Sequence, residues 1–254
     1  MVGCNNRLRL NDKIMYRTSP KAQAGVDPID FPVCGPQIRR SALKTIHFYL
    51  DFISPYAWLA FDALPRALQG ISHRVVHKPV LFAAMLKHHG QLGPAEIPAK
   101  RDWTYRQVLW QARQQGTPLQ LPALHPFNPL GLLRLATACD ADGQPNRYVC
   151  EQVFRHVWCA GEDAADPQRL AQLTAHLGPA RDAASAEVKQ ALQAHTDEAL
   201  ALGVFGVPSF WVDDKLFWGQ DALPMLRAYL QGDAWFDGPD WQAPAQCGVG
   251  VRRA

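Results

Sequence analysis

Apolar and polar residues alternate over residues 46–53, which predicts a β-strand buried on one face. The apolar face carries Ile46, Phe48, Leu50 and Phe52, and the opposite face carries His47, Tyr49 and Asp51. From Pro55 to about Leu68, apolar residues recur at helical spacing instead. Ser54 and Pro55 favour a helix start, because serine caps helices and proline suits their first position. The pattern therefore places the Ser54 hydroxyl at a helix N-terminus, where an anion is favoured.

The remaining pattern divides into a long helical stretch between two groups of strands. A second strand over 72–79 follows Gly70 and completes a strand–helix–strand unit, whose spacing favours a parallel, right-handed crossover. Helical periodicity then predicts helices over 102–115, 129–141, 145–160, 167–177 and 186–202. At the end of the chain we expect a strand over 209–212, a turn at Asp213-Asp214, a strand over 216–218 and a helix over 222–230.

This order of elements predicts an α/β protein with a thioredoxin-like fold, in which a helical domain is inserted between the βαβ and ββα halves. The thioredoxin-like domain is expected over 44–80 and 204–231, and the inserted helical domain over 81–203. Residues 1–43 show weak periodicity and many prolines, so we expect a disordered or loosely docked extension. Residues 232–254 are expected to form an irregular tail.

Composition excludes several classes of function. Hydrophobic residues make up 48% and charged residues 19%, and the net charge of +3 comes without a basic run longer than two residues. We therefore expect a soluble protein with no nucleic-acid partner. No apolar run reaches membrane-span length, and the N-terminus lacks a secretory signal. The six cysteines are scattered without a C-x-x-C pair or zinc spacing, which fits a reducing cytoplasm and no metal site.

Five segments follow one another in an order that resembles a known family. They are 51–60 (DFISPYAWLA), 94–101 (PAEIPAKR), 126–130 (PFNPL), 203–210 (GVFGVPSF) and 216–221 (LFWGQD). Together they are similar to the 2-hydroxychromene-2-carboxylate isomerases, which are relatives of kappa-class glutathione transferases and DsbA-type proteins. The resemblance spans about 44–230, and the extension before it has no counterpart.

Ser54 stands where thiol oxidoreductases of this fold carry the first cysteine of C-x-x-C. The four positions here are Ser54-Pro55-Tyr56-Ala57, so a disulfide relay at this site is chemically excluded. The helix N-terminus remains, and a serine hydroxyl can donate a hydrogen bond to a thiolate supplied from outside. Glutathione is the expected cofactor, and these interactions could lower its thiol pKa of roughly 8.5 by about one to two units. Taken alone, Ser54 would be only a helix cap.

The resemblance implies further glutathione-binding residues. The Val207-Pro208 bond is expected to be cis and to face Ser54, leaving the Val207 backbone free to pair with an extended peptide. Gln220 and Asp221 would hold the γ-glutamyl end of glutathione at the start of the last helix. The alternatives are a turn proline at 208 and a simple helix cap at 221.

The inserted segment supplies the candidates for substrate binding. Lys100 and Arg101 would hold a carboxylate, or form a solvated basic pair. Asn128 would bind substrate, or only cap a helix. His88, next to His89, lies where the family has pocket residues, although surface histidines are the simpler interpretation. Tyr105 would line an aromatic wall with Trp103 and Trp110, although their helical spacing favours core packing.

The predicted function is a glutathione-dependent isomerase. The resemblance implies interconversion of 2-hydroxychromene-2-carboxylate and trans-o-hydroxybenzylidenepyruvate, or of a similar aromatic carboxylate, by thiolate addition, bond rotation and elimination. One alternative is a kappa-like glutathione transferase. The other is a non-catalytic thioredoxin-fold protein that binds peptides or partners. The sequence does not decide whether the protein forms a homodimer.

Overall fold

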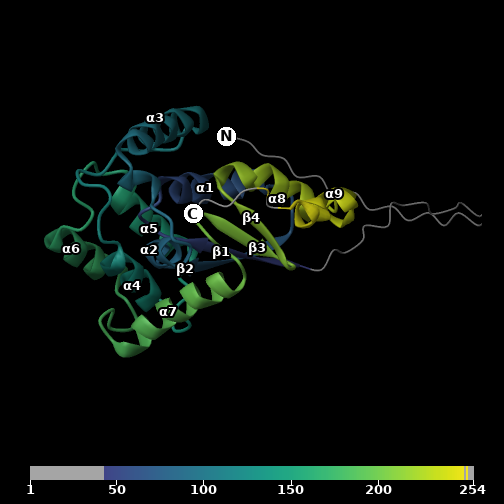
Figure 1. Cartoon of the computed structure of the whole chain (residues 1–254). Coiled ribbons are helices and arrows are strands. Elements are labelled where there is room, and N and C mark those ends of the chain that lie inside the picture. Colours follow the sequence, from purple (N-terminus) through teal and green to yellow (C-terminus); the bar gives the residue numbers. More distant parts are fainter. Residues whose placement is uncertain (1–42, 249, 251–254) are drawn as a thin grey trace, which may run out of the picture. The chain divides into compact units, whose positions relative to one another are not determined.

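The computed structural model describes residues 43–248 and 250 (Figure 1). The extension predicted over 1–43 therefore lies outside the described residues, apart from Leu43. Within the described part, four strands form a mixed sheet in the order β2-β1-β3-β4. These strands are β1 (Lys44–Leu50), β2 (His73–Pro79), β3 (Ser209–Val212) and β4 (Lys215–Trp218). Strand β1 is parallel to β2 and antiparallel to β3, which confirms the predicted thioredoxin-like α/β fold and its parallel crossover.

Strand β1 ends three residues earlier than predicted because Asp51 turns the chain. Its carboxylate accepts hydrogen bonds from the N–H groups of Ile53 (3.1 Å) and Phe82 (3.0 Å). The N–H of Ser54 also donates to the Asp51 carbonyl at 3.1 Å. A side chain that bonds to the backbone two residues on replaces ladder pairing by a turn. Tyr49 and Asp51 are fully buried, so the second face of β1 is covered as well.

Helix α1 (Pro55–Ala67) begins where the sequence predicts. The Ser54 Oγ accepts a hydrogen bond from the N–H of Ala57 at 3.2 Å, as an N-cap does. The inner face of the helix packs on aromatic rings of β1 and α5. Phe61 lies 5.1 Å from Phe154, and Phe52 lies 4.8 Å from Phe154, between ring centroids. This aromatic contact fixes α1, and with it Ser54, against the sheet.

Helices fill the chain between β2 and β3, as predicted. They are α2 (Phe82–His88), α3 (Pro98–Gln115), α4 (Leu130–Ala138), α5 (Arg147–Trp158), α6 (Pro167–Leu177) and α7 (Ala186–Ala201), with a 3-10 turn, η1 (Pro94–Glu96). The bounds of α6 agree with the prediction, whereas α2 was not predicted. Helix α3 starts earlier than expected because Pro98 occupies its first position.

The helices cover both faces of the sheet (Figure 1). Helices α1, α5 and α8 (Leu223–Leu230) share the main core with β1 and β3, whereas α2 and α7 cover the opposite face. Because Phe154 of α5 packs on Phe52 and Phe61, the helical segment and the sheet share one apolar core. The division into an inserted domain and a thioredoxin-like domain stays a prediction. Among the described helices, none is long and apolar enough to cross a membrane.

The C-terminal part is more ordered than predicted. Asp213 and Asp214 adopt positive φ angles of 46° and 67° in the turn between β3 and β4. A 3-10 turn, η2 (Gln220–Ala222), precedes α8, and the tail forms short turns at η3 (Ala234–Asp237), α9 (Pro239–Gln242) and η4 (Ala243–Gln246). Phe236 is 3% exposed and packs on Phe217 and Tyr229. Burial of its ring ties the tail to the core.

Candidate functional site

The loop between β1 and α1 is held through its backbone carbonyls. The indole N–H of Trp158 donates to the Phe52 carbonyl at 2.9 Å, and a ring nitrogen of His125 lies 2.8 Å from the Ile53 carbonyl. The Ser54 carbonyl accepts from the first turn of α1. Three successive carbonyls are therefore bound by α5, by the loop before α4 and by α1. This arrangement fixes the position of Ser54.

The Ser54 hydroxyl can still donate a hydrogen bond, because its contact with a protein acceptor is long. The residue is 8% exposed, and its oxygen already accepts from the Ala57 N–H. Its nearest acceptor is the Val207 carbonyl at 3.5 Å, the outer limit of a hydrogen bond. An anion that approaches the N-terminus of α1 can therefore take the hydroxyl hydrogen without breaking a strong bond.

Asp51 lies beneath this loop and is fully buried. Burial raises the pKa of Asp51 to about 7, although the hydrogen bonds from the N–H groups of Phe82 and Ile53 act in the opposite direction. No described cation forms a salt bridge with this carboxylate. It joins the loop that carries Ser54 to the first residue of α2.

Val207 and Pro208 lie opposite Ser54, and the peptide bond between them is cis, as expected. The Pro208 carbonyl accepts from the Gly219 N–H at 2.9 Å. Gly219 has a φ of 97°, and a Cβ there would collide with the Asp221 carboxylate. The structure thus links Ser54, Val207, Pro208 and Asp221 through successive contacts. None of the hydrogen bonds found among the described residues uses the N–H of Val207.

Gln220 and Asp221 belong to η2 and precede α8, which begins at Leu223. Gln220 is half-buried and Asp221 is exposed. The charge of Asp221 acts on Tyr56, whose pKa is raised mainly by burial and further by this carboxylate. The Tyr56 hydroxyl donates to Gln107 of α3 at 2.5 Å. Tyr56 of α1 is therefore hydrogen-bonded to α3 and lies within the electrostatic influence of the Asp221 turn.

Tyr105 is connected to the Ser54 loop through His125, a residue that the sequence did not identify as a candidate. Its hydroxyl lies 2.7 Å from Nδ1 of His125, whose Nε2 lies 2.8 Å from the Ile53 carbonyl. The charge of Arg101, one turn earlier on α3, acts on Tyr105, although burial dominates and raises the pKa of Tyr105. Arg101 and Tyr105 thus stand on one face of α3. His125 precedes the 126–130 motif, which is the signal that could have identified it.

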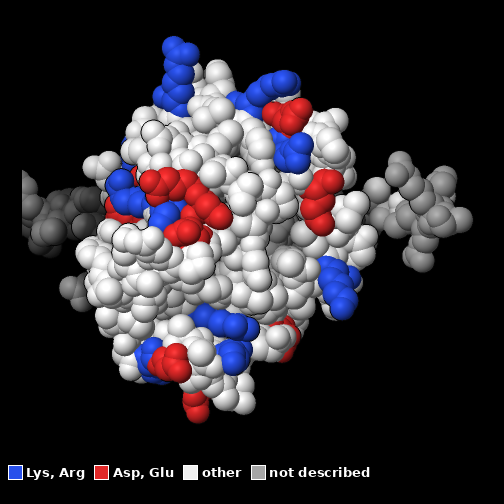
Figure 2. Space-filling model, turned by 90° about the vertical axis from the view of Figure 1, so that its left-hand side faces the viewer, with Lys and Arg blue, Asp and Glu red and all other residues white. Residues whose placement is uncertain are grey.

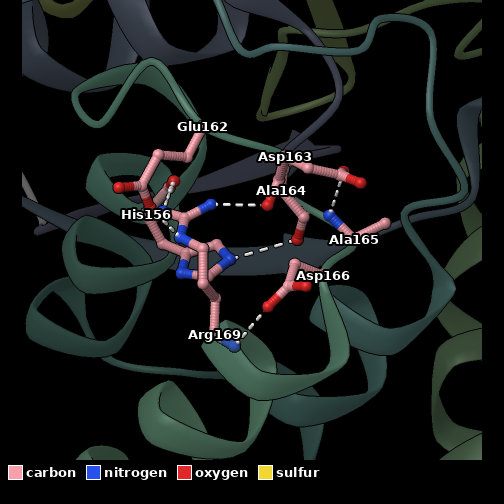
Figure 3. A network of polar contacts seen from close by, with 7 residues as sticks. All are labelled: His156, Glu162, Asp163, Ala164, Ala165, Asp166 and Arg169. Atoms are coloured by element: carbon pink, nitrogen blue, oxygen red, sulfur yellow. Dashed lines mark hydrogen bonds and ion pairs between the residues drawn. The ribbon is translucent and has the colours of Figure 1, made fainter.

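The loop that carries His125 is held by backbone hydrogen bonds at more than one point. The Gln120 N–H donates to the Trp158 carbonyl at 2.7 Å, and the Ala123 N–H donates to the Glu162 carbonyl at 3.1 Å. Figure 3 shows how the supporting segment is itself held, with Arg169 of α6 bonded to the Asp163 and His156 carbonyls. These contacts give His125 a rigid base.

Other predicted substrate residues are farther out on the surface. Lys100 is exposed, and Arg101 is 3.9 Å from Asp102 in an ion pair. Asn128 is exposed, and its side-chain oxygen accepts from the Leu130 N–H at 3.1 Å, but the N-cap position of α4 is Pro129 and not Asn128. His88 is exposed at the end of α2 and contacts His89. No described hydrogen bond joins these residues to Ser54.

The expectation of core packing for Trp103 and Trp110 was wrong, because they are 63% and 61% exposed on α3. Two concavities of about 640 and 460 Å³ lie beside the β2 edge and at the start of β1, and neither is lined by Ser54 or Tyr105. On the face in Figure 2, acidic and basic side chains form small mixed groups between broad uncharged areas. That face offers no continuous basic surface.

The fold and the site together define a thioredoxin-like protein that carries Ser54 and Ala57 in place of the redox cysteine pair. A comparison with family models agrees, since the DSBA-like thioredoxin domain matches residues 45–231. The chain therefore belongs to the family of DSBA-like thioredoxin domains. This family membership confirms the resemblance seen in the sequence.

The relatives include both isomerases and glutathione transferases. A 2-hydroxychromene-2-carboxylate isomerase of Sphingobium xenophagum is 29% identical over 196 residues, covering 74% of this chain and 98% of the relative. Glutathione S-transferase kappa 2 of Caenorhabditis elegans is 27% identical over 207 residues, covering 74% and 92%. A solved structure of 2-hydroxychromene-2-carboxylate isomerase aligns with a TM-score of 0.65 at 24% identity, covering 78% and 98%, and supports the fold.

Proposed function

We propose that this chain is a glutathione-dependent isomerase that interconverts 2-hydroxychromene-2-carboxylate and trans-o-hydroxybenzylidenepyruvate, or a closely similar aromatic carboxylate. The observation that carries the proposal is the Ser54 hydroxyl, which caps α1 and whose oxygen lies 3.5 Å from the Val207 carbonyl, the one acceptor it meets among the described residues. The relatives named as isomerases and glutathione transferases support it.

The protein contributes an environment that keeps the sulfur of bound glutathione charged. A hydrogen bond to a charged group stabilises it by about 1.5–3 kcal/mol, and a helix N-terminus adds about 0.3–1 kcal/mol. Because about 1.4 kcal/mol corresponds to one pKa unit, the hydrogen bond alone lowers a thiol pKa of roughly 8.5 by about one to two units, and the helix N-terminus lowers it slightly further. At neutral pH, a substantial fraction of the bound cofactor is then thiolate.

Glutathione would lie between α1 and the segment opposite it. The backbone of Val207 offers an N–H and a carbonyl to the extended peptide, beside Pro208. Asp221 offers a carboxylate to the ammonium of the γ-glutamyl group, and Gln220 offers its amide. The exposed carboxylate and half-buried amide suit a ligand that enters from solvent.

Once the ring of the cyclic isomer has opened to a ketone, the thiolate adds to the carbon conjugated with that ketone. The double bond becomes a single bond, rotation follows, and elimination of the thiolate restores the other isomer. Arg101, with Lys100, would hold the substrate carboxylate, and Tyr105 would contact its oxygen atoms. Asn128 and His88 would contact the substrate from the protein surface.

The test is the thiol pKa of bound glutathione in Ser54→Ala, followed by thiolate absorbance during a pH titration. We expect the pKa to rise by about one to two units and isomerisation to slow by about ten- to a hundredfold. Ser185→Ala is the matched control, because Ser185 caps α7 by the same type of hydrogen bond, to the Val188 N–H at 3.3 Å. Equal pKa values in wild type and Ser54→Ala would contradict the proposal.

A kappa-like glutathione transferase is the second candidate, and the Caenorhabditis elegans relative favours it. The same thiolate would then attack an electrophile that carries a leaving group. A substrate panel separates the two, since a transferase consumes glutathione and an isomerase returns it. Absence of glutathione binding by calorimetry would contradict both and favour a non-catalytic binding protein.

A further inference from the structure

The two ring nitrogens of His125 have fixed and different partners. Nε2 lies 2.8 Å from the Ile53 carbonyl, which can only accept a hydrogen bond, so Nε2 carries a hydrogen. In a neutral ring Nδ1 then has a free lone pair, and the Tyr105 hydroxyl 2.7 Å away must be its donor. The same hydroxyl is 3.3 Å from the His125 carbonyl, a longer contact. The tautomer therefore follows from the geometry.

The surroundings keep this ring neutral. Burial lowers the pKa of His125, while the Ile53 carbonyl acts in the opposite direction. The ring is faced by Tyr105 from α3, by Trp158 from α5 and by Phe127 from its own loop. None of these carries a permanent charge. The nearest charged groups in the contact chain are Arg101 and Asp102, which act on Tyr105.

The hydroxyl of Tyr105 thus points its hydrogen toward His125, and its oxygen lone pairs remain for another donor. Tyr105 is half-buried, so the oxygen can meet a ligand. The pair is joined to Ile53, the residue that precedes Ser54. The neutral imidazole thus connects the Tyr105 hydroxyl to the backbone directly before Ser54.

We propose that Tyr105 and His125 form a proton relay that takes the hydroxyl proton from the cyclic substrate and returns it to the phenolic oxygen of the open product. This inference rests on the proposed isomerase function. Tyr105 is the catalytic residue in the relay, because it contacts the substrate oxygen. His125 acts through Tyr105 and is a positioning residue that also stores the proton.

The step balances without any further reactant. The O–H bond at the ring carbon breaks, its electron pair forms the ketone C=O, and the bond from that carbon to the ring oxygen breaks. The proton passes to the Tyr105 oxygen while the Tyr105 hydrogen moves to Nδ1 of His125. The reverse transfer delivers a proton to the phenolate, so the relay returns to its starting state.

The experiment compares three variants of the full chain with glutathione bound. Tyr105→Phe should lower kcat for isomerisation by about a hundredfold, within the usual range for acid–base catalysis, while the thiol pKa of bound glutathione stays unchanged. The control is Tyr148→Phe, because Tyr148 and His176 form a second tyrosine–histidine pair at 2.9 Å on the exposed surface. This control should leave kcat as in wild type.

The variant His125→Gln distinguishes a proton relay from a purely structural role of His125. A glutamine amide can still donate to the Ile53 carbonyl and accept from Tyr105, but it cannot store a proton. We expect kcat to fall as in Tyr105→Phe, with KM and the melting temperature near wild type, and the acidic limb of the pH–kcat profile to vanish.

A kcat within twofold of wild type in Tyr105→Phe, whether or not KM changes, would overturn the relay alone. A wild-type protein that binds glutathione but does not isomerise the substrate would remove the proposed function and the relay together. A lowered kcat with an altered thiol pKa would assign Tyr105 to cofactor binding and also reject the relay.

Discussion

The two faces of the sheet are both buried, but they are built from different chemistry. The face toward α1 and α5 is aromatic: the ring of Phe48 is tilted against Phe210, with centroids 4.6 Å apart, and stacked on Phe61 at 6.5 Å. The face toward α7 holds a buried lysine, because Lys78 donates to both oxygens of Glu198 at 2.6 Å. The Tyr49 hydroxyl donates to the same carboxylate at 2.7 Å.

The two faces therefore differ in the interactions that stabilise them. The aromatic face holds α1 by area burial, which does not depend on the state of any proton. On the other face, burial raises the pKa of Glu198, but the hydrogen bonds from Lys78 and Tyr49 more than offset this and lower it overall. Ser54 is attached to the aromatic face, so its position should persist when the polar face is disturbed.

The largest effect is expected from the aromatic face. Phe154→Ala removes a fully buried ring that contacts Phe52, Trp58 and Phe61, and should lower the free energy of unfolding by about 3–5 kcal/mol. Urea unfolding measures the change. Trp110→Ala, an exposed side chain on α3, is the control and should change stability by less than about 0.5 kcal/mol.

The second prediction concerns His77, a titratable residue that contacts Phe48 and Phe61 on the aromatic face. Burial, with the charge of Arg147, lowers the pKa of His77 to about 4. Between about pH 6.5 and pH 4 the unfolded chain binds a proton there that the folded chain excludes, so stability falls as pH falls, by up to about 3 kcal/mol. His77→Gln should lose this part of the pH dependence.

Asp51 acts in the opposite direction over a similar interval. Its folded pKa of about 7 lies above its unfolded value, so the folded state binds the extra proton and gains stability as pH falls from about 7 to 4. The measurement is therefore the difference in unfolding free energy between wild type and His77→Gln at each pH, in which the contribution of Asp51 cancels. A constant difference from pH 7 to pH 4 would contradict the prediction.

The smallest effect is expected on the polar face. Glu198→Gln leaves the buried Lys78 ammonium without a counter-charge, but the carboxylate is 40% exposed and water reaches the site. We expect a loss of about 1–2 kcal/mol in urea unfolding. Lys78→Met should cost less, because it buries no uncompensated charge. An equal or larger loss in Lys78→Met would show that the two faces do not differ in the way described.

Local patterns predicted most of the elements that hold Ser54. The alternation in β1, the serine–proline start of α1 and the cap-plus-proline start of α6 each depend on neighbouring residues. The end of β1 could not be predicted in the same way, because the Asp51 carboxylate bonds to Phe82, 31 residues away. Helix α2 has seven residues and no side-chain cap, so it left no clear signal.

The same limit explains which site residues were missed. Val207 and Pro208 could be proposed because their motif accompanies the fold, and the structure places Val207 opposite Ser54. His125 lies in a proline-rich loop without periodicity, and its partners are 20 and 72 residues away. Only the packed chain brings them together.

The loop before α1 is held through the main-chain oxygens of residues 52 and 53, whereas the hydroxyl of residue 54 accepts one bond from the Ala57 N–H and makes one long contact with the Val207 carbonyl. The position of this loop therefore depends little on the reactive atom of residue 54. Exchanging the Ser54 oxygen for sulfur would therefore leave the loop in place, and the sulfur nucleophile of the proposed reaction would then belong to the chain and not to bound glutathione.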